Sequence, residues 1–172
     1  VNTAIKAEMA SQREIHEAEI VMSSLNKKAK EVVEKYDVSA CTDVTGFGLL
    51  GHGAEMATAS QVCLNLDVRK IPYFEDAKEY AKMGLIPAGA YKNRGHSGRY
   101  VDVGDTPEYY VDLLYDPQTS GDFSSVWPRN RQMLSWKILR KRDWIRSCHD
   151  WRSIGKRSGG QYVYPACLER VG

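Results

Sequence analysis

One stretch of the sequence gathers the residues best suited to chemistry: Ala-Cys-Thr-Asp-Val-Thr-Gly-Phe-Gly-Leu-Leu-Gly-His, at positions 40–52. Its pattern predicts a strand that ends in a glycine-containing turn and opens a helix, with Asp43 between the hydroxyls of Thr42 and Thr45. The free N–H groups of such a turn suit a phosphate. A carboxylate beside a phosphate requires a cation between them, and Mg²⁺ typically takes that place. The spacing is neither a P-loop nor G-x-G-x-x-G, so a turn that needs glycine only for its backbone stays an alternative.

Two further side chains of this stretch are candidates for chemistry. His52 could serve as a base or a ligand, although a histidine near a helix start is more often packed or hydrogen-bonded. We interpret Cys41 as a small strand residue. The four cysteines show neither a C-x-x-C pair nor a metal-ligand spacing, which argues against a zinc site and a disulfide framework and favours a reducing cytoplasm.

Helices and strands alternate around this stretch. Ser11 and Glu14 form a capping box, and apolar residues at spacings of three and four predict one helix from there to about Tyr36. A strand is expected over residues 38–42. Alternating apolar residues predict a second strand over 62–68, with one face in the core.

Glycine and proline residues mark the boundaries of elements in the next part of the chain. A helix is predicted over about 74–82, with Gly84 as its stop signal. Residues 85–104 are glycine-rich and basic, which predicts a loop with a short strand near 100–103, and Pro107 marks a further helix start. The cations of this loop could meet an anion or could simply be solvated: Lys92, Arg94 and Arg99.

A change in composition near residue 121 predicts a domain boundary. Residues 1–121 carry 13 Lys and Arg against 18 Asp and Glu, whereas residues 122–172 carry 11 against 4. All four tryptophans and 8 of the 12 arginines fall in the second part. We therefore expect a first domain, 1–121, and a basic, Trp-rich tail, 122–172. No apolar run approaches the ~20 residues of a membrane span, and the start at Val1 suggests a fragment or a processed chain.

The 40–52 stretch closely resembles a signature of selenophosphate synthetases (selenide, water dikinases), which belong to the superfamily of aminoimidazole ribonucleotide synthetase-like ATP-using enzymes. Three more segments resemble the same family: Leu-Asn at 25–26, Ile-Pro-Ala-Gly-Ala-Tyr-Lys-Asn at 86–93, and Asp-Pro-Gln-Thr-Ser-Gly at 116–121. The resemblance runs from about Thr3 to Gly121 and covers that enzyme's C-terminal domain. It implies an α/β (α+β) fold, a layered sandwich with a mixed sheet, incomplete at its C-terminal end.

The resemblance stops at Gly121. The family continues with a second glycine and an apolar strand such as Leu-Leu-Ile, whereas this chain has Asp-Phe-Ser-Ser-Val at 122–126. Codons chosen for these residues spell Gly-Leu-Leu-Ile-Ser when one G is restored. We hypothesise that the tail comes largely from a one-base deletion or a sequencing error. The alternative is a genuine tail that binds nucleic acid through phosphate contacts and base stacking, using basic residues around Trp136, Trp144 and Trp151.

The resembled enzymes make selenophosphate from selenide, ATP and water, and release AMP and phosphate. The resemblance assigns one metal-binding residue, Asp43, which would help to hold Mg²⁺ on the ATP phosphates. The family's catalytic Cys or Sec and its partner Lys lie upstream, in an N-terminal domain absent from this chain. No catalytic residue is therefore assigned, the nucleotide-binding residues stay open, and the isolated chain is expected to be inactive. The full-length enzyme would be a cytoplasmic homodimer without membrane attachment.

Two other functional classes stay open at this point. One is a different enzyme of the superfamily, such as an aminoimidazole ribonucleotide synthetase-like ligase. The other is a non-catalytic fragment, whose basic tail would bind nucleic acid. The upstream coding sequence would discriminate the first, and a salt-dependent interaction with single-stranded nucleic acid would favour the second.

Overall fold

The computed structural model describes residues 1–27, 30, 31, 34, 40–69 and 71–119, together with four short strands farther along the chain. The described elements are, in order, α1 (Asn2–Lys6), α2 (Gln12–Ser23), β1 (Ala40–Asp43), α4 (Gly48–Ser60), β2 (Cys63–Leu66), α5 (Glu75–Lys82), α6 (Ala88–Ser97), the 3₁₀ turn η1 (Gly98–Tyr100), β3 (Val101–Asp102), α7 (Glu108–Tyr115), β4 (Phe123–Val126), β5 (Leu134–Ser135), β6 (Ile145–Cys148) and β7 (Ala166–Leu168).

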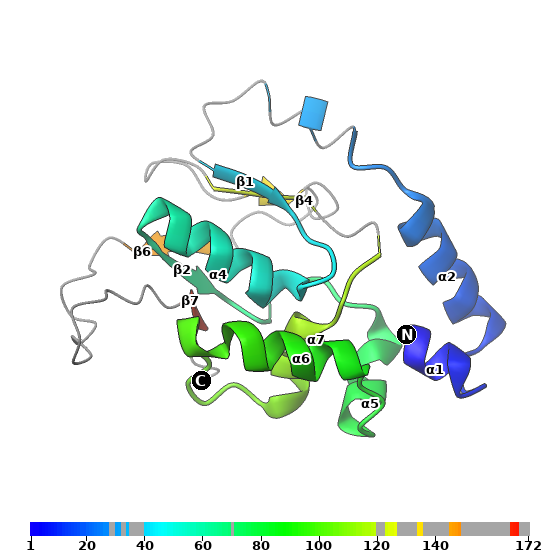
Figure 1. Ribbon diagram of the computed structural model, residues 1–172. Helices are drawn as coiled ribbons and strands as arrows, with labels where there is room; N and C mark the ends of the chain where they lie inside the picture. The colour runs from blue at the N-terminus through cyan, green and yellow to red at the C-terminus, as the bar shows by residue number, and fades with distance from the viewer. Residues whose placement is uncertain are drawn as a thin grey trace.

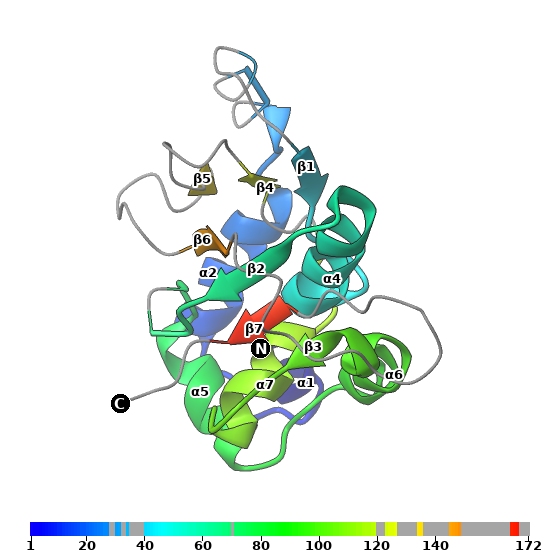
Figure 2. The same ribbon diagram turned by 90° about the vertical axis from the view of Figure 1, so that its left-hand side faces the viewer.

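The described strands form two sheets. In the first, β4 lies between β1 and β5 and runs antiparallel to both. In the second, of order β3-β7-β2-β6, β2 runs parallel to β7 and antiparallel to β6. The helices α4, α6 and α7 pack against one another, and α4 also contacts β1 and β2 (Figures 1 and 2). The fold is therefore the predicted α/β (α+β) arrangement with a mixed sheet.

The hydrophobic core lies where α4, β2 and α7 meet. Its largest fully buried side chains come from these elements and from the residue that follows β2 by two positions: Leu50, Leu64, Leu66, Val68, Val111, Leu114 and Tyr115. The burial of these side chains supplies the main free energy that holds the 40–52 stretch against α7. The predicted core face of this segment is confirmed, and Cys63 and Asp67 on the other face are buried as well.

The predicted capping box at the start of α2 is confirmed. The Ser11 hydroxyl accepts from the Glu14 amide at 3.3 Å, and the Glu14 carboxylate accepts from the Ser11 amide at 2.6 Å. The Glu14 carboxylate also accepts from the hydroxyl of Tyr80 at 2.6 Å. The cap therefore joins α2 to α5, which are far apart in the sequence.

The prediction of one helix as far as Tyr36 is wrong, because α2 ends at Ser23. Ser24 adopts an extended backbone, and the hydroxyls of Ser23 and Ser24 both donate to the carbonyl of Ile20. Such side-chain bonds compete with the continuation of a helix. A separate helical turn follows Asn26, and residue 25, expected in the buried face, is 77% exposed.

The prediction of a loop over residues 85–104 is also wrong. This region contains α6 and η1, although the short strand expected near 100–103 is present as β3. Three buried side chains of α6 pack it against the core: Ala90, Asn93 and Ser97. Tertiary packing thus overrides the low helix propensity of the glycines in this segment.

The other predicted elements are confirmed within one or two residues at most ends. The helix of the 40–52 stretch is α4, the helix expected over 74–82 is α5, and Gly84 follows it with a φ of +78°. Pro107 is the N-cap of α7 instead of its first residue. In the tail, Leu134–Ser135 forms β5. Most of the tail, including the tryptophans, lies outside the described residues.

Candidate functional site

The candidate site is the turn between β1 and α4. β1 ends at Asp43, whose side chain is exposed, and the Thr42 hydroxyl donates to the Asp43 carbonyl at 3.0 Å. The carbonyl of Thr45 accepts two backbone bonds of 3.0 Å, from the amides of Gly48 and Gln118. The backbone of the turn is therefore fixed from two directions, and Asp43, just before it, is exposed to solvent.

Gly48 is required by the geometry of this turn. Its φ is +71°, a region that side-chain-bearing residues rarely adopt. A Cβ at this position would lie 2.7 Å from the carbonyl carbon of Tyr115 and 2.8 Å from the carbonyl oxygen of Leu114. The absent side chain thus allows the start of α4 to lie directly on the C-terminal end of α7.

Asn93, a residue of α6, is hydrogen-bonded at the same junction between the turn and the end of α7. Its side-chain amide donates to the carbonyl of Gly46 at 2.8 Å and to the carbonyl of Tyr115 at 2.9 Å. The residue is 8% exposed, so both bonds lie within the protein. A single amide group therefore satisfies the turn after β1 and the end of α7 at once.

The segments that resemble the family meet at this turn. Gly89 lies so close to Pro117 that an added Cβ would approach the proline ring to 2.6 Å. Gln118, one residue later, bonds to the turn at Thr45. The segments 40–52, 86–93 and 116–119, distant in sequence, therefore form one spatial unit around the candidate site.

A hydrogen-bond chain runs from the turn into α4. The Thr45 hydroxyl lies 3.1 Å from His52 Nε2, and His52 Nδ1 lies 3.2 Å from a carboxylate oxygen of Glu55. The ring of Phe47 is tilted against His52 at a centroid distance of 5.4 Å and stacks on His96 at 6.0 Å. His52 is therefore both packed and hydrogen-bonded, which is the more frequent role expected for it.

The oxygen donors of the turn fit Mg²⁺, which prefers carboxylate and other oxygen ligands and usually keeps several waters. Asp43 supplies a carboxylate, and Thr42 and Thr45 supply hydroxyls nearby in the sequence. Among the described residues, no three His, Cys, Asp or Glu side chains come close enough together to hold a metal ion. A cation at Asp43 would need oxygen ligands besides the described His, Cys, Asp and Glu side chains.

Cys41, two residues before Asp43, is an exposed residue of β1 whose thiol has a raised pKa. Desolvation by the surrounding protein raises the pKa of its thiol to about 11, and the negative charge of Asp43 acts in the same direction. A thiolate is the reactive form, so Cys41 stays a thiol near neutral pH.

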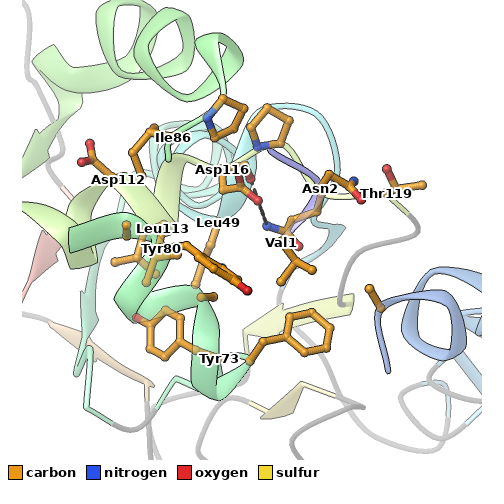
Figure 3. Close-up of a pocket in the computed structure, with 18 of the residues that line it drawn as sticks. Val1, Asn2, Leu49, Tyr73, Tyr80, Ile86, Asp112, Leu113, Asp116 and Thr119 are labelled. Atoms are coloured by element: carbon orange, nitrogen blue, oxygen red, sulfur yellow. Dashed lines mark hydrogen bonds between the residues drawn. The ribbon is translucent and has the colours of Figure 1, made fainter. Parts of the chain in front are cut away.

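A cavity of about 320 Å³ lies between α2, α5, α7 and the segment that follows α7, and Val44 and Leu49 of the 40–52 stretch also line it (Figure 3). Its walls are mostly apolar, with Tyr73 and Tyr80 on one side and Asp116 on another (Figure 3). Burial raises the pKa of Asp116 to about 6, although the amino group of Val1 and a hydrogen bond from Gln118 oppose the shift. The Tyr73 hydroxyl is buried and has no hydrogen-bond partner in the described part of the chain.

The basic side chains of the 85–104 segment do not converge into an anion site. Arg94 pairs with Glu108, with Asp112 at 3.9 Å, and Arg99 lies over the ring of Tyr100. Lys92 is exposed on α6. The reading of these cations as solvated or paired surface residues is therefore the one that the structure supports.

The chain belongs to a known family. The sequence model of the AIR synthase related protein, C-terminal domain, matches residues 3–101, which is more than half of the chain. The resemblance noted in the sequence is thereby confirmed at the level of this domain. No described helix is both long and apolar enough to cross a membrane.

Curated relatives carry a more specific name. The selenide, water dikinase of Caldanaerobacter subterraneus subsp. tengcongensis is 47% identical over 121 residues, which are 70% of this chain and 35% of that protein. The selenide, water dikinase of Treponema denticola is 43% identical over 69% of this chain and 34% of its own length. That of Clostridioides difficile is 48% identical over 70% and 35%. This chain therefore spans about a third of the length of the curated relatives it matches.

The sequence identified the turn but not the contacts that support it. Asn93 and Gln118 lie inside segments singled out by their family resemblance, yet their roles as partners of the turn depend on the packing of α6 and α7. The link between Thr45, His52 and Glu55 was also missed. The sequence did contain a signal for the contact between His52 and Glu55, because the two residues are three positions apart on a predicted helix.

Proposed function

We propose that this chain is the C-terminal part of a selenide, water dikinase, the enzyme that makes selenophosphate from selenide, ATP and water with release of AMP and phosphate. The likeness to curated enzymes of that name, at 43 to 48% identity over about 70% of the chain, supports this assignment. The main structural support is that the segments 40–52, 86–93 and 116–119, which resemble the family, meet at the turn that bears Asp43. An aminoimidazole ribonucleotide synthetase-like ligase is the less favoured alternative, because the relatives named above are all selenide, water dikinases.

In this proposal Asp43 helps to bind Mg²⁺ together with the phosphates of ATP. A divalent cation there would offset the negative charge of the phosphates as a phosphoryl group is transferred. The chain's own contribution is to hold the carboxylate at the surface of a turn whose backbone is fixed through Thr45, Gly48 and Asn93. The fixed backbone keeps the carboxylate in place without reorganisation during the reaction.

The remaining parts of the site would come from outside this chain. We propose that an upstream domain supplies the reactive Cys or Sec and its partner Lys, and that the whole enzyme is a homodimer in the cytoplasm. The isolated chain is then expected not to form AMP from ATP and selenide. Selenide-dependent AMP formation by the 172-residue chain alone would contradict this expectation.

A chimaera tests the function directly. The corresponding part of the Clostridioides difficile enzyme is replaced by residues 1–121 of this chain, and AMP release is measured with and without selenide. We expect selenide-dependent AMP release, and a loss of about 100-fold or more for Asp43→Asn, since a charge-stabilising cation contributes several kcal/mol to such a step. The matched control is Asp102→Asn, an exposed aspartate whose bond from the Gly104 amide an asparagine oxygen can still accept.

Each outcome of this experiment points to one conclusion. Equal losses in both variants would refute a special role for Asp43. A stable chimaera that lacks selenide-dependent activity would refute the proposed function. Activity with an unrelated ATP-dependent substrate would favour the ligase alternative.

We also propose that the tail from Asp122 onward is largely a product of a shifted reading frame. The matches to the relatives are 119 to 122 residues long, about the length of the segment 1–121. β4 pairs with β1 in the register Asp43↔Phe123 to Ala40↔Val126, so a strand occupies the place where the restored frame would put Leu-Leu-Ile. Sequencing the coding DNA across residue 121 decides the matter, and a frame with immediate stop codons would refute the proposal.

A further inference from the structure

The hydrogen-bond chain from Thr45 through His52 to Glu55 has a direction. We propose that His52 is a positioning residue that holds the Thr45 hydroxyl as a donor into the protein and so leaves its oxygen free to accept at the turn. This inference rests on the proposed function of the turn as a cation site. It adds His52 and Glu55 to the residues that prepare that site.

The direction follows from what each group can donate. An ionised carboxylate can only accept, so the 3.2 Å contact with Glu55 requires the proton of His52 to be on Nδ1. In the neutral ring Nε2 then carries a lone pair and no hydrogen. The Thr45 hydroxyl, 3.1 Å from Nε2, must therefore be the donor of that bond.

The orientation matters because the hydroxyl of Thr45 can rotate, whereas the backbone of the residue cannot. The Thr45 carbonyl already accepts from the amides of Gly48 and Gln118, so the backbone of the residue is fixed. A hydroxyl that donates into the protein keeps its remaining lone pairs for a cation or for water bound to a cation. In the reverse arrangement the hydroxyl would use a lone pair on the histidine and would itself have a hydrogen to donate away from the ring.

His52 is itself held firmly enough to do this. Its side chain is 11% exposed, and the Phe47 ring lies against it. Glu55 is 56% exposed and lies three residues farther along α4, so the partner that selects the tautomer is at the surface. A carboxylate fixes the tautomer in the same way for many histidines that bind a metal directly.

The tautomer can be observed in the intact chain by long-range ¹H–¹⁵N NMR of the histidine rings at about pH 9, where neutral imidazole prevails. We expect His52 to show a protonated Nδ1 and an unprotonated Nε2, with the exposed His16 as an internal reference. A protonated Nε2 on His52 would overturn the inference.

Substitutions at Glu55 test the cause of the tautomer. Glu55→Lys replaces an acceptor by a group that can only donate, so the proton should move to Nε2 and the Thr45 hydroxyl should become the acceptor. Glu55→Ala should give a mixture of the two tautomers. The control Glu75→Ala, at an exposed position of α5, should leave His52 unchanged. A tautomer that does not respond to Glu55→Lys would show that Glu55 does not set it.

The link to the cation is tested with Mn²⁺, whose paramagnetism broadens the amide signals of nearby residues. We expect selective broadening around Asp43, an affinity about tenfold lower for Thr45→Val, and recovery in Thr45→Ser, which restores the hydroxyl. No selective broadening in the unmodified chain would count against the proposed cation site itself. Broadening that Thr45→Val leaves unchanged would refute the role of the hydroxyl and leave the cation site standing.

Discussion

Replacing Asn93 with aspartate removes the two bonds that hold the candidate site together while leaving the shape of the side chain almost unchanged. In the folded protein the amide nitrogen donates to the carbonyl oxygens of Gly46 and Tyr115 at 2.8 and 2.9 Å. In Asn93→Asp a carboxylate oxygen faces the same two carbonyl oxygens. Attraction at both contacts is thereby turned into repulsion, inside the protein.

The size of the effect follows from the two lost bonds. A buried acceptor left without its donor costs about 1–3 kcal/mol, so Asn93→Ala should lower the free energy of unfolding by about 2–6 kcal/mol. Asn93→Asp should cost more than Asn93→Ala at pH 7, because a buried charge without a partner adds its own penalty. These values are a large part of the ~5–15 kcal/mol that stabilises a typical domain.

The stability of the Asn93→Asp variant should also depend on pH. Burial against two carbonyls raises the pKa of the new carboxyl in the folded state, so its protonated form, which can donate one bond, is favoured there. The deficit relative to the unmodified chain should therefore shrink as the pH falls and should grow as the pH rises through the folded-state pKa. Asn93→Ala should show no such recovery.

Urea unfolding followed by circular dichroism at about pH 5 and pH 7 measures both effects through the transition midpoint. The control is Asn2→Asp, the same exchange at an exposed position in α1, which should change the midpoint little. An Asn93→Asp midpoint equal to that of the unmodified chain at pH 7 would refute the reasoning. A deficit that does not depend on pH would refute the assignment of the two donated bonds.

Three further substitutions test the surroundings of the site. Gly48→Ala should destabilise the fold by about 2 kcal/mol or more, since its φ is +71° and a Cβ would meet backbone at 2.7 Å, whereas Gly46→Ala, with nothing within 4 Å, should change thermal stability little. Burial raises the pKa of Asp116 in the folded protein to about 6, above its unfolded-state value of ~3.9. The free energy of unfolding should therefore fall by about 2 kcal/mol as the pH rises from about 4 to 6. In urea titrations at several pH values, Asp116→Asn should abolish this loss. Hydrogen bonding, chiefly with Ser11, lowers the pKa of Glu14 to about 2, which stabilises the fold above the unfolded-state pKa of ~4.3 and is lost as the pH falls toward 2; Glu14→Gln should flatten that acid limb.

Local chemistry was sufficient for several features of this chain. The capping box of Ser11 and Glu14 depends on atoms three residues apart, and the glycines of the 40–52 stretch mark a strand-to-helix turn through backbone freedom alone. The family resemblance then pointed to Asp43 as the candidate metal-binding residue of that turn. These signals act over short distances in sequence, so no knowledge of the packing was needed to find them.

Contacts between residues far apart in the sequence became clear only from the tertiary structure. The helix over 88–97 forms despite its glycines because Asn93 is buried between two carbonyls that lie 47 and 22 residues away. The helix from Ser11 stops early because serine hydroxyls bond back to Ile20. The sequence alone therefore determined which turn carries the candidate site, through backbone chemistry confined to a few residues. Only the packing of α6 and α7 decided how that turn is held, because hydrogen bonds between distant segments form only once the core has brought them together.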